Sequence, residues 1–266
     1  MMKNRTALLT KSILAAVLLT FVSAAFVSAR DTISIIKERK KLIVGLEAEY
    51  PPFEFKNDKG ELVGFDVDVA KKIAERLGVE IEIKEYKWDQ LLFALKWQEI
   101  DMVISGMTRT LERAMVVNFS DAYFETGQVV MLSPRKKAVS DWRELNNESV
   151  KIAVCKDTTG EITAKNKLPN ASLIQYLGEA QASTELIANR VDAFVFDKPY
   201  ADDLVVKYPQ LRILPDQLSY ELYCFAIDEG DLHYLLWLNY FLDEIRLTGE
   251  YEEIYNYWFV EKRWKK

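Results

Sequence analysis

The sequence predicts an α/β protein of two lobes, each a mainly parallel sheet with flanking helices. Short apolar runs of strand length alternate with segments of helical periodicity, and this alternation occurs in two successive series. A charged segment that contains a proline, residues 133–137, separates the two series. The final stretch of the chain, from Tyr220 onward, is too small to bury its own aromatic side chains. We therefore expect it to pack on the lobe that the first series forms. We therefore assign residues 30–132 and 219–266 to lobe 1 and residues 133–218 to lobe 2, joined by two crossover hinge segments.

The first series contains the strands and helices of lobe 1. Pro51 and Pro52 follow its first apolar run. The predicted strand must end before them, because proline cannot continue a strand ladder. Asp66 can cap the next helix, and Gly78 stands where a left-handed residue ends it. The expected elements are strands 42–46, 81–83 and 100–104, a helix from Asp66 to Leu77, and a helix over 89–98.

The second series repeats the pattern. The expected elements are strands 151–155, 173–176, 193–196 and 211–214, with helices from about residue 160, over 180–190 and over 199–208. A strand over 222–227 and helices through Trp258 complete the chain. Cys155 and Cys224 lie inside apolar runs, and we expect two buried free thiols although an exported protein could pair them.

Composition excludes several classes of function. The 266 residues are 49% apolar, which is enough for a proper core without metals or disulfides. The single histidine, His233, excludes a histidine-rich zinc site, and we expect no metal and no cofactor. A net charge of -6 offers no excess of cations for phosphates, so nucleic acid is not an expected partner.

The first 29 residues are typical of a secretory signal peptide. Positive charges precede an apolar run at residues 13–26, and small residues follow up to Ala29. A membrane anchor is the alternative, but this run of 14 residues is shorter than the ~20 needed to span a bilayer. Because no cysteine stands at the cleavage site, we expect a soluble periplasmic protein without a lipid anchor.

Polar side chains gather where the expected strands end, which is where ligands bind in open α/β sheets. Arg113, with the hydroxyls of Thr108 and Thr159, would hold a carboxylate. Asp197 would hold an ammonium group, and it can also cap the helix that follows. An α-amino acid carries both groups. The complete candidate set is Glu47, Tyr50, Trp88, Gly106, Thr108, Arg113, Lys156, Thr159 and Asp197.

The sequence resembles the periplasmic solute-binding proteins of polar amino-acid ABC transporters, the bacterial extracellular solute-binding proteins of family 3. The resemblance covers the mature chain. It rests on motifs in family order: 50–55 (YPPFEF), 64–68 (GFDVD), 105–108 (SGMT) with Glu112-Arg113, 118–123 (NFSDAY), 158–160 (TTG), 191–197 and 249–259. Around Cys155 and Asp157, the latter often glycine in related proteins, the chain departs from the pattern.

The resemblance implies a type II periplasmic binding fold and a non-enzymatic role. It implies that Arg113, Thr108 and Thr159 bind the α-carboxylate, that the Gly106 carbonyl and Asp197 bind the α-ammonium, and that Tyr50 and Trp88 cover the ligand side chain. Closure of the lobes about hinges near residues 132–135 and 216–220 would trap the amino acid. A monomer would then deliver it to a membrane permease with a partner ATPase, since the chain has no phosphate-binding loop of its own.

The amino acid itself stays open at this point. Glu47 with the aromatic faces favours a basic amino acid, which we place first. Lys156 would neutralise Glu47 and suit glutamine. Glu47 with Trp88-Asp89 also resembles cystine-binding members. Two other classes of function share this fold: a cyclohexadienyl dehydratase-like enzyme, which has no need of Asp197 as an ammonium site, and a sensor that presents the ligand to a chemoreceptor.

Overall fold

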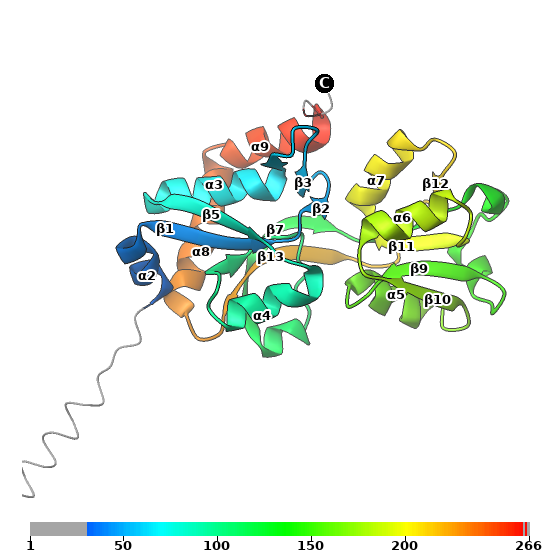
Figure 1. Ribbon diagram of the computed structural model, residues 1–266, viewed down its shortest axis with the longest axis horizontal. Coiled ribbons are helices and arrows are strands. Elements are labelled where there is room, and N and C mark those ends of the chain that lie inside the picture. Colours follow the sequence, from blue (N-terminus) through cyan, green and yellow to red (C-terminus); the bar gives the residue numbers. More distant parts are fainter. Residues whose placement is uncertain (1–30, 263, 265–266) are drawn as a thin grey trace, which may run out of the picture.

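The computed structural model describes residues 31–262 and 264, which form the two predicted lobes (Figure 1). The predicted signal peptide lies outside the described residues. Within the described part of the chain, no helix combines the length and apolar character that crossing a bilayer requires. Cys155 and Cys224 are buried free thiols, as expected.

Lobe 1 is a five-stranded mixed sheet covered by helices on both faces. The strand order is β5-β1-β6-β13-β7, in which β1 pairs in parallel with β5 and β6, and β13 pairs antiparallel with β6 and β7. In Figure 1, α3 and α4 lie on opposite sides of this sheet. The elements are α2 (Thr32–Arg39), β1 (Lys41–Leu46), α3 (Phe65–Leu77), β5 (Glu80–Glu85), α4 (Leu91–Lys96), β6 (Met102–Val103), β7 (Val117–Thr126), β13 (Glu221–Asp228), α8 (Leu232–Leu247) and α9 (Glu250–Tyr255).

Lobe 2 repeats the design with the strand order β10-β9-β11-β8-β12. Strand β9 pairs in parallel with β10 and β11, and β8 pairs antiparallel with β11 and β12. The elements are β8 (Gln128–Leu132), β9 (Lys151–Cys155), α5 (Thr159–Lys167), β10 (Ser172–Tyr176), α6 (Glu179–Ile187), β11 (Ala193–Asp197), α7 (Lys198–Lys207) and β12 (Arg212–Ile213).

The two-lobed α/β fold is confirmed, but each sheet is mixed where we expected a mainly parallel one. The chain leaves lobe 1 along β7 and returns along β13, and these two strands lie side by side. A pair of neighbouring strands that run out and back must be antiparallel.

The first crossing lies at Gly127, between β7 and β8, and not at the expected segment near residue 133. The apolar run 129–132 belongs to the sheet of lobe 2, where all five residues of β8 are buried. Residues 133–137 instead form a turn within lobe 2, in which Arg135 pairs with Asp192 at 2.9 Å. The second crossing falls near Ser219, within the expected segment. A Cβ atom on Gly127 would lie 2.0 Å from the Ser219 carbonyl oxygen, so the two crossings touch each other.

Several local elements differ from the sequence prediction. The helix expected over 89–98 begins with a 3-10 turn and is α-helical only over α4, and the strand expected over 100–104 is reduced to β6. Helix α2 and a small antiparallel sheet of β2 (Glu49–Tyr50), β3 (Glu54–Lys56) and β4 (Leu62–Val63) were not expected. These strands are too short for their alternation to be recognised in the sequence.

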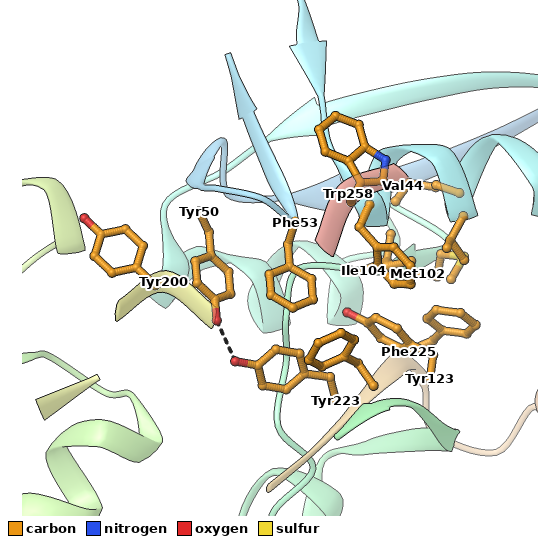
Figure 2. Close-up of a cluster of buried hydrophobic side chains, with 14 of the residues drawn as sticks. Val44, Tyr50, Phe53, Met102, Ile104, Tyr123, Tyr200, Tyr223, Phe225 and Trp258 are labelled. Atoms are coloured by element: carbon orange, nitrogen blue, oxygen red, sulfur yellow. Dashed lines mark hydrogen bonds between the residues drawn. The ribbon is translucent and has the colours of Figure 1, made fainter. Parts of the chain in front are cut away.

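An aromatic cluster fills the core of lobe 1 beneath this small sheet (Figure 2). Phe53 is fully buried, and its ring stacks on Tyr50 with a centroid separation of 4.9 Å. The Phe53 ring also contacts Phe65, Phe124, Tyr223 and Phe259. Because a Phe side chain at such a position removes much apolar area from water, this cluster is a major source of stability.

We expect Phe53→Ala to lower the free energy of unfolding by about 3–5 kcal/mol, because the cavity left in a packed core cannot collapse fully. The measurement is urea denaturation followed by tryptophan fluorescence. The matched control is Phe93→Ala, because Phe93 is 68% exposed, and this change should stay within ~0.5 kcal/mol of the wild type. Equal losses in the two variants would contradict the assignment of Phe53 to the core.

Candidate ligand-binding site

A cavity between the two lobes collects most of the predicted site residues. Eight of them line it, and they come from the carboxyl ends of strands in both lobes and from the turns that follow: Glu47, Tyr50, Trp88, Gly106, Thr108, Arg113, Thr159 and Asp197. The other lining residues are Glu54, Ser105, Cys155, Thr158, Leu177, Glu179 and Phe196. The strand ends of the two sheets therefore face one another across this cavity.

Lys156 is the predicted residue that does not line the cavity. Its side chain is 49% exposed and its ammonium lies 3.7 Å from the carboxylate of Asp157. The charges that act most on Glu47 are the carboxylates of Glu49 and Asp89. The neutralisation of Glu47 by Lys156, which would have favoured glutamine, is therefore not seen.

Two side chains of lobe 1 contact one backbone carbonyl of lobe 2. The carbonyl oxygen of Asp157 in lobe 2 accepts hydrogen bonds from Trp88 Nε1 at 3.0 Å and from Arg113 Nη2 at 3.2 Å. Asp157 adopts a positive φ of 61°, a conformation that glycine adopts without strain and aspartate tolerates. Asp157, where the chain departs from the pattern of the resembling proteins, thus adopts a backbone conformation that a glycine would also suit.

Arg113 is fixed from two directions. Its Nη1 donates to the carbonyl oxygen of Thr108 at 2.7 Å, and its guanidinium lies 5.0 Å from the centre of the Trp88 ring. Burial lowers the pKa of Arg113, while the nearby carboxylates of Glu221 and Asp197 act to raise it. A guanidinium stays charged in such a setting, and it is the one cationic side chain among the cavity-lining residues.

The hydroxyls of Thr108 and Thr159 both donate to Glu221, which was not among the predicted site residues. The Oε2 atom of Glu221 accepts from Thr108 Oγ1 at 2.7 Å and from Thr159 Oγ1 at 2.8 Å. Its Oε1 atom accepts from Ser219 Oγ at 2.8 Å, beside the second crossing. One buried carboxylate therefore links lobe 1, lobe 2 and the crossing. A lone acidic residue at the start of the apolar run 222–227 was the available signal.

Asp197 is buried at the end of β11, and its side chain does not cap the helix that follows. Its Oδ1 accepts from Gln128 Nε2 at 2.7 Å. Burial raises the pKa of Asp197 to about 8, and the charge of Glu221 adds to this effect. The carboxyl group is thus available to the cavity, where a cation would ionise it.

Glu47 lies just after β1, opposite lobe 2. Its Oε1 accepts from the backbone N–H of Trp88 at 3.3 Å. Burial raises the pKa of Glu47 to about 7, and the charges of Glu49 and Asp89 add to it. Without a cationic partner, this carboxylate is partly protonated near neutral pH.

Tyr50 and Gly106 pack against each other at the floor of the cavity. The hydroxyl groups of Tyr50 and Tyr223 lie 2.7 Å apart. Figure 2 marks this hydrogen bond with a dashed line. Gly106 has a positive φ of 51°, and a Cβ atom there would lie 2.5 Å from Tyr50 Cε1. Glycine is required at this position for both reasons.

Two cavity-lining carboxylates, Glu54 and Glu179, were not predicted. Glu54 is fully buried beside Asp66, and its Oε1 accepts from Ser105 Oγ at 2.7 Å. Asp66 does not cap helix α3, contrary to our expectation; it accepts instead from the backbone N–H of Gly106 at 2.8 Å and from the Tyr123 hydroxyl at 2.7 Å. Burial raises the pKa of both carboxyls of this pair.

Comparison with known proteins identifies the family of this chain. A family model for bacterial extracellular solute-binding proteins, family 3, matches residues 42–261. The chain belongs to this family. A glutamine-binding protein of an ABC transporter from Bacillus subtilis is 30% identical over 238 residues, which cover 88% of this chain and 86% of the relative.

Two solved structures resemble the fold of this chain closely. A binding component of an ABC transporter from Wolinella succinogenes, in complex with lysine, has 37% sequence identity and a TM-score of 0.81, and the match covers 85% of this chain and 98% of that one. An ancestral amino acid-binding protein described as a precursor of cyclohexadienyl dehydratase has 37% identity and a TM-score of 0.82, covering 86% and 99%. The family 3 fold is therefore established over most of the chain.

We expect the stability of the protein to fall as the pH rises from 5 to 8. The pKa values of Glu47 and Asp197 are raised to about 7 and about 8 in the folded state, whereas in the unfolded chain both side chains are ionised above ~4.5. The folded state thus holds protons that the unfolded state has released, and this favours unfolding as the pH rises. Melting temperatures, measured by calorimetry without added amino acid, should drop by about 3 °C or more.

The double variant Glu47→Gln, Asp197→Asn should have a flatter profile between pH 5 and 8, since its amides do not titrate. A wild-type melting temperature that rises over this interval would contradict the raised pKa values.

Proposed function

We propose that this protein is the extracytoplasmic substrate-binding component of an ABC importer and that its ligand is a cationic L-amino acid of the arginine or lysine class. The observation that carries the proposal is the excess of acidic over basic side chains in the cavity lining. Four carboxyl side chains line it against a single cation, Arg113: Glu47, Glu54, Glu179 and Asp197. An α-carboxylate pairs with Arg113 and an α-ammonium with Asp197, which leaves unneutralised acids for a second ligand cation.

The α-groups of the ligand would bind where Arg113 and Asp197 meet. Arg113 can present its guanidinium to the α-carboxylate, together with backbone N–H groups at the start of α5. The hydroxyls of Thr108 and Thr159 would turn from Glu221 to the ligand, or accept from its ammonium while still donating to Glu221. Asp197 and the Gly106 carbonyl would take the α-ammonium.

The ligand side chain would extend toward Glu47 between aromatic rings. Tyr50 and Trp88 provide faces on which the aliphatic part of a long side chain packs, and an aromatic face also attracts a cation. Glutamine, whose amide carries no charge, would leave Glu47 without a charged partner. The lysine-bound relative from Wolinella succinogenes supports a cationic ligand. The glutamine-binding relative from Bacillus subtilis makes glutamine the alternative ligand.

Binding would be coupled to closure of the lobes. Lobe 1 contributes Glu47, Trp88 and Arg113, and lobe 2 contributes Thr159 and Asp197. A ligand stabilises the closed state only if it contacts both sets at once. We propose hinges at Gly127 and Ser219, where the two crossings touch. The closed monomer, exported to the periplasm, would dock on a membrane permease served by a separate ATPase.

An enzymatic role is the second candidate, since one structural neighbour is described as a precursor of cyclohexadienyl dehydratase. That neighbour is itself described as an amino acid-binding protein. Asp197 argues for binding here as well, because prephenate carries no ammonium group for it to hold. We therefore propose that the protein is not an enzyme, and incubation with prephenate and arogenate should give no product.

We expect arginine or lysine to raise the melting temperature of the mature protein more than other amino acids do. The screen uses protein from Arg30 onward, refolded once to remove carried-over ligand, with the twenty amino acids, ornithine, citrulline and cystine at ~1 mM. A ligand present at 100 times its Kd stabilises the native state by ~2.7 kcal/mol, which is several degrees. A largest shift with glutamine or cystine would contradict the cationic ligand and keep the transport role.

We expect Arg113→Ala to weaken binding of the identified amino acid by at least ~2 kcal/mol, roughly thirtyfold in Kd, because the α-carboxylate loses its charged partner. Isothermal titration calorimetry measures the change. The matched control is Arg109→Ala, an exposed arginine four residues earlier, which should leave the affinity unchanged. Unchanged affinity in Arg113→Ala would refute the carboxylate assignment.

A further inference from the structure

Glu179 is a buried carboxylate that the α-carboxylate and α-ammonium sites do not use. It is the first residue of α6 in lobe 2, is 3% exposed and lines the cavity that Glu47 lines from lobe 1. Its Oε1 atom has no hydrogen-bond partner among the described residues. A buried polar atom left without a partner destabilises the folded protein, so its presence at a cavity wall points to a ligand group.

The groups around Glu179 are acids and neutral side chains. The charges that act most on it are the carboxylates of Glu47, Glu49 and Asp197, and burial together with these charges raises its pKa. Glu179 in turn acts on Tyr50, Glu54, Cys155 and Tyr200. None of these seven residues is a cation. The helix dipole and the backbone N–H of Glu179 itself favour its charged form, but they do not bring a counter-ion.

A ligand cation placed between Glu47 and Glu179 would meet a carboxylate from each lobe. Guanidinium is planar and carries five N–H donors, so two of its edges can each donate hydrogen bonds to a different carboxylate. The ammonium of lysine is a compact group that is more strongly hydrated, and a neutral side chain would leave both carboxyls unpaired. The two acids therefore favour guanidinium most.

We propose that Glu179 is a specificity-determining residue, which together with Glu47 binds the distal cation of the ligand side chain and selects a guanidinium-bearing amino acid. This inference rests on the proposed function, because it assumes that the α-amino acid group occupies Arg113 and Asp197. The guanidinium then contacts both lobes, and its charge contributes to closure.

The test is Glu179→Gln, which keeps the shape of the side chain and removes its charge. Titration calorimetry compares L-arginine with L-citrulline, in which a neutral urea group replaces the guanidinium. We expect the variant to bind arginine at least about tenfold more weakly and citrulline within about threefold of the wild type. The matched control is Glu185→Gln on the same helix. The Glu185 carboxylate lies 2.6 Å from Arg190 Nε, and Glu185 does not line the cavity. This control should bind arginine as the wild type does.

The outcomes separate the two levels of the proposal. Arginine binding by Glu179→Gln within about threefold of the wild type would overturn the role of Glu179 and leave the proposed function intact. A wild-type protein that binds no cationic amino acid would overturn both. A wild-type protein that prefers lysine to arginine would overturn the selection of guanidinium.

A second measurement covers the case in which Glu179→Gln does not fold. In the Glu47→Gln variant at pH 7, proton release on binding is determined by calorimetry in buffers of different ionisation enthalpy. Asp197 contributes equally to the proton release on binding of arginine and of citrulline, because both ligands carry the same α-ammonium. The difference in proton release between the two ligands therefore reports the carboxyl groups near the distal end of the ligand side chain. We expect arginine to release about half a proton or more beyond citrulline, because Glu179 ionises to meet the guanidinium. Equal proton release would overturn the proposal.

Discussion

The burial of carboxyl groups between two lobes is the constraint on which the rest of this structure depends. Glu47, Glu179 and Asp197 lie at the cavity with raised pKa values, and Arg113 is the single cation among its lining residues. Closing the lobes removes these acids from water, which is unfavourable unless a partner arrives. The proposed cationic amino acid would supply that partner, so the same desolvation that disfavours the empty closed state would give the protein its selectivity.

Glu221 explains how the lobes come together around such a site. Its carboxylate accepts hydrogen bonds from Thr108 in lobe 1, from Thr159 in lobe 2 and from Ser219 at the crossing. The anion thus occupies the donors that a ligand carboxylate would use, at the point where the two crossings touch. A buried charge with several donors is well satisfied, and this contact positions the hydroxyls close to Arg113. The proposed hinge and the proposed binding site are therefore parts of one hydrogen-bonded network.

The rigid floor of the site comes from the aromatic core. Tyr50 stacks on Phe53 and forms a hydrogen bond with Tyr223 (Figure 2). It also packs over Gly106, whose backbone N–H donates to Asp66. Tyr50 also contacts Phe196 and Tyr200 of lobe 2. Core packing in lobe 1 therefore fixes a ring that both lines the cavity and meets the opposite lobe, which ties the position of the ligand side chain to the stability of the fold.

Local patterns along the chain were enough to predict the α/β class, the two lobes, the family and eight of the residues that line the cavity, because periodicity and motif spacing are local properties. The position of the first crossing depends on long-range strand pairing, since the apolar run 129–132 pairs with β11 and β12 only in the folded sheet. The tertiary structure also placed Lys156 outside the cavity and brought in Glu54, Glu179 and Glu221. The sequence around each of these three acids does not distinguish it from a surface glutamate. Burial beside residues distant in sequence turns them into site residues, and desolvation depends on all neighbours in space.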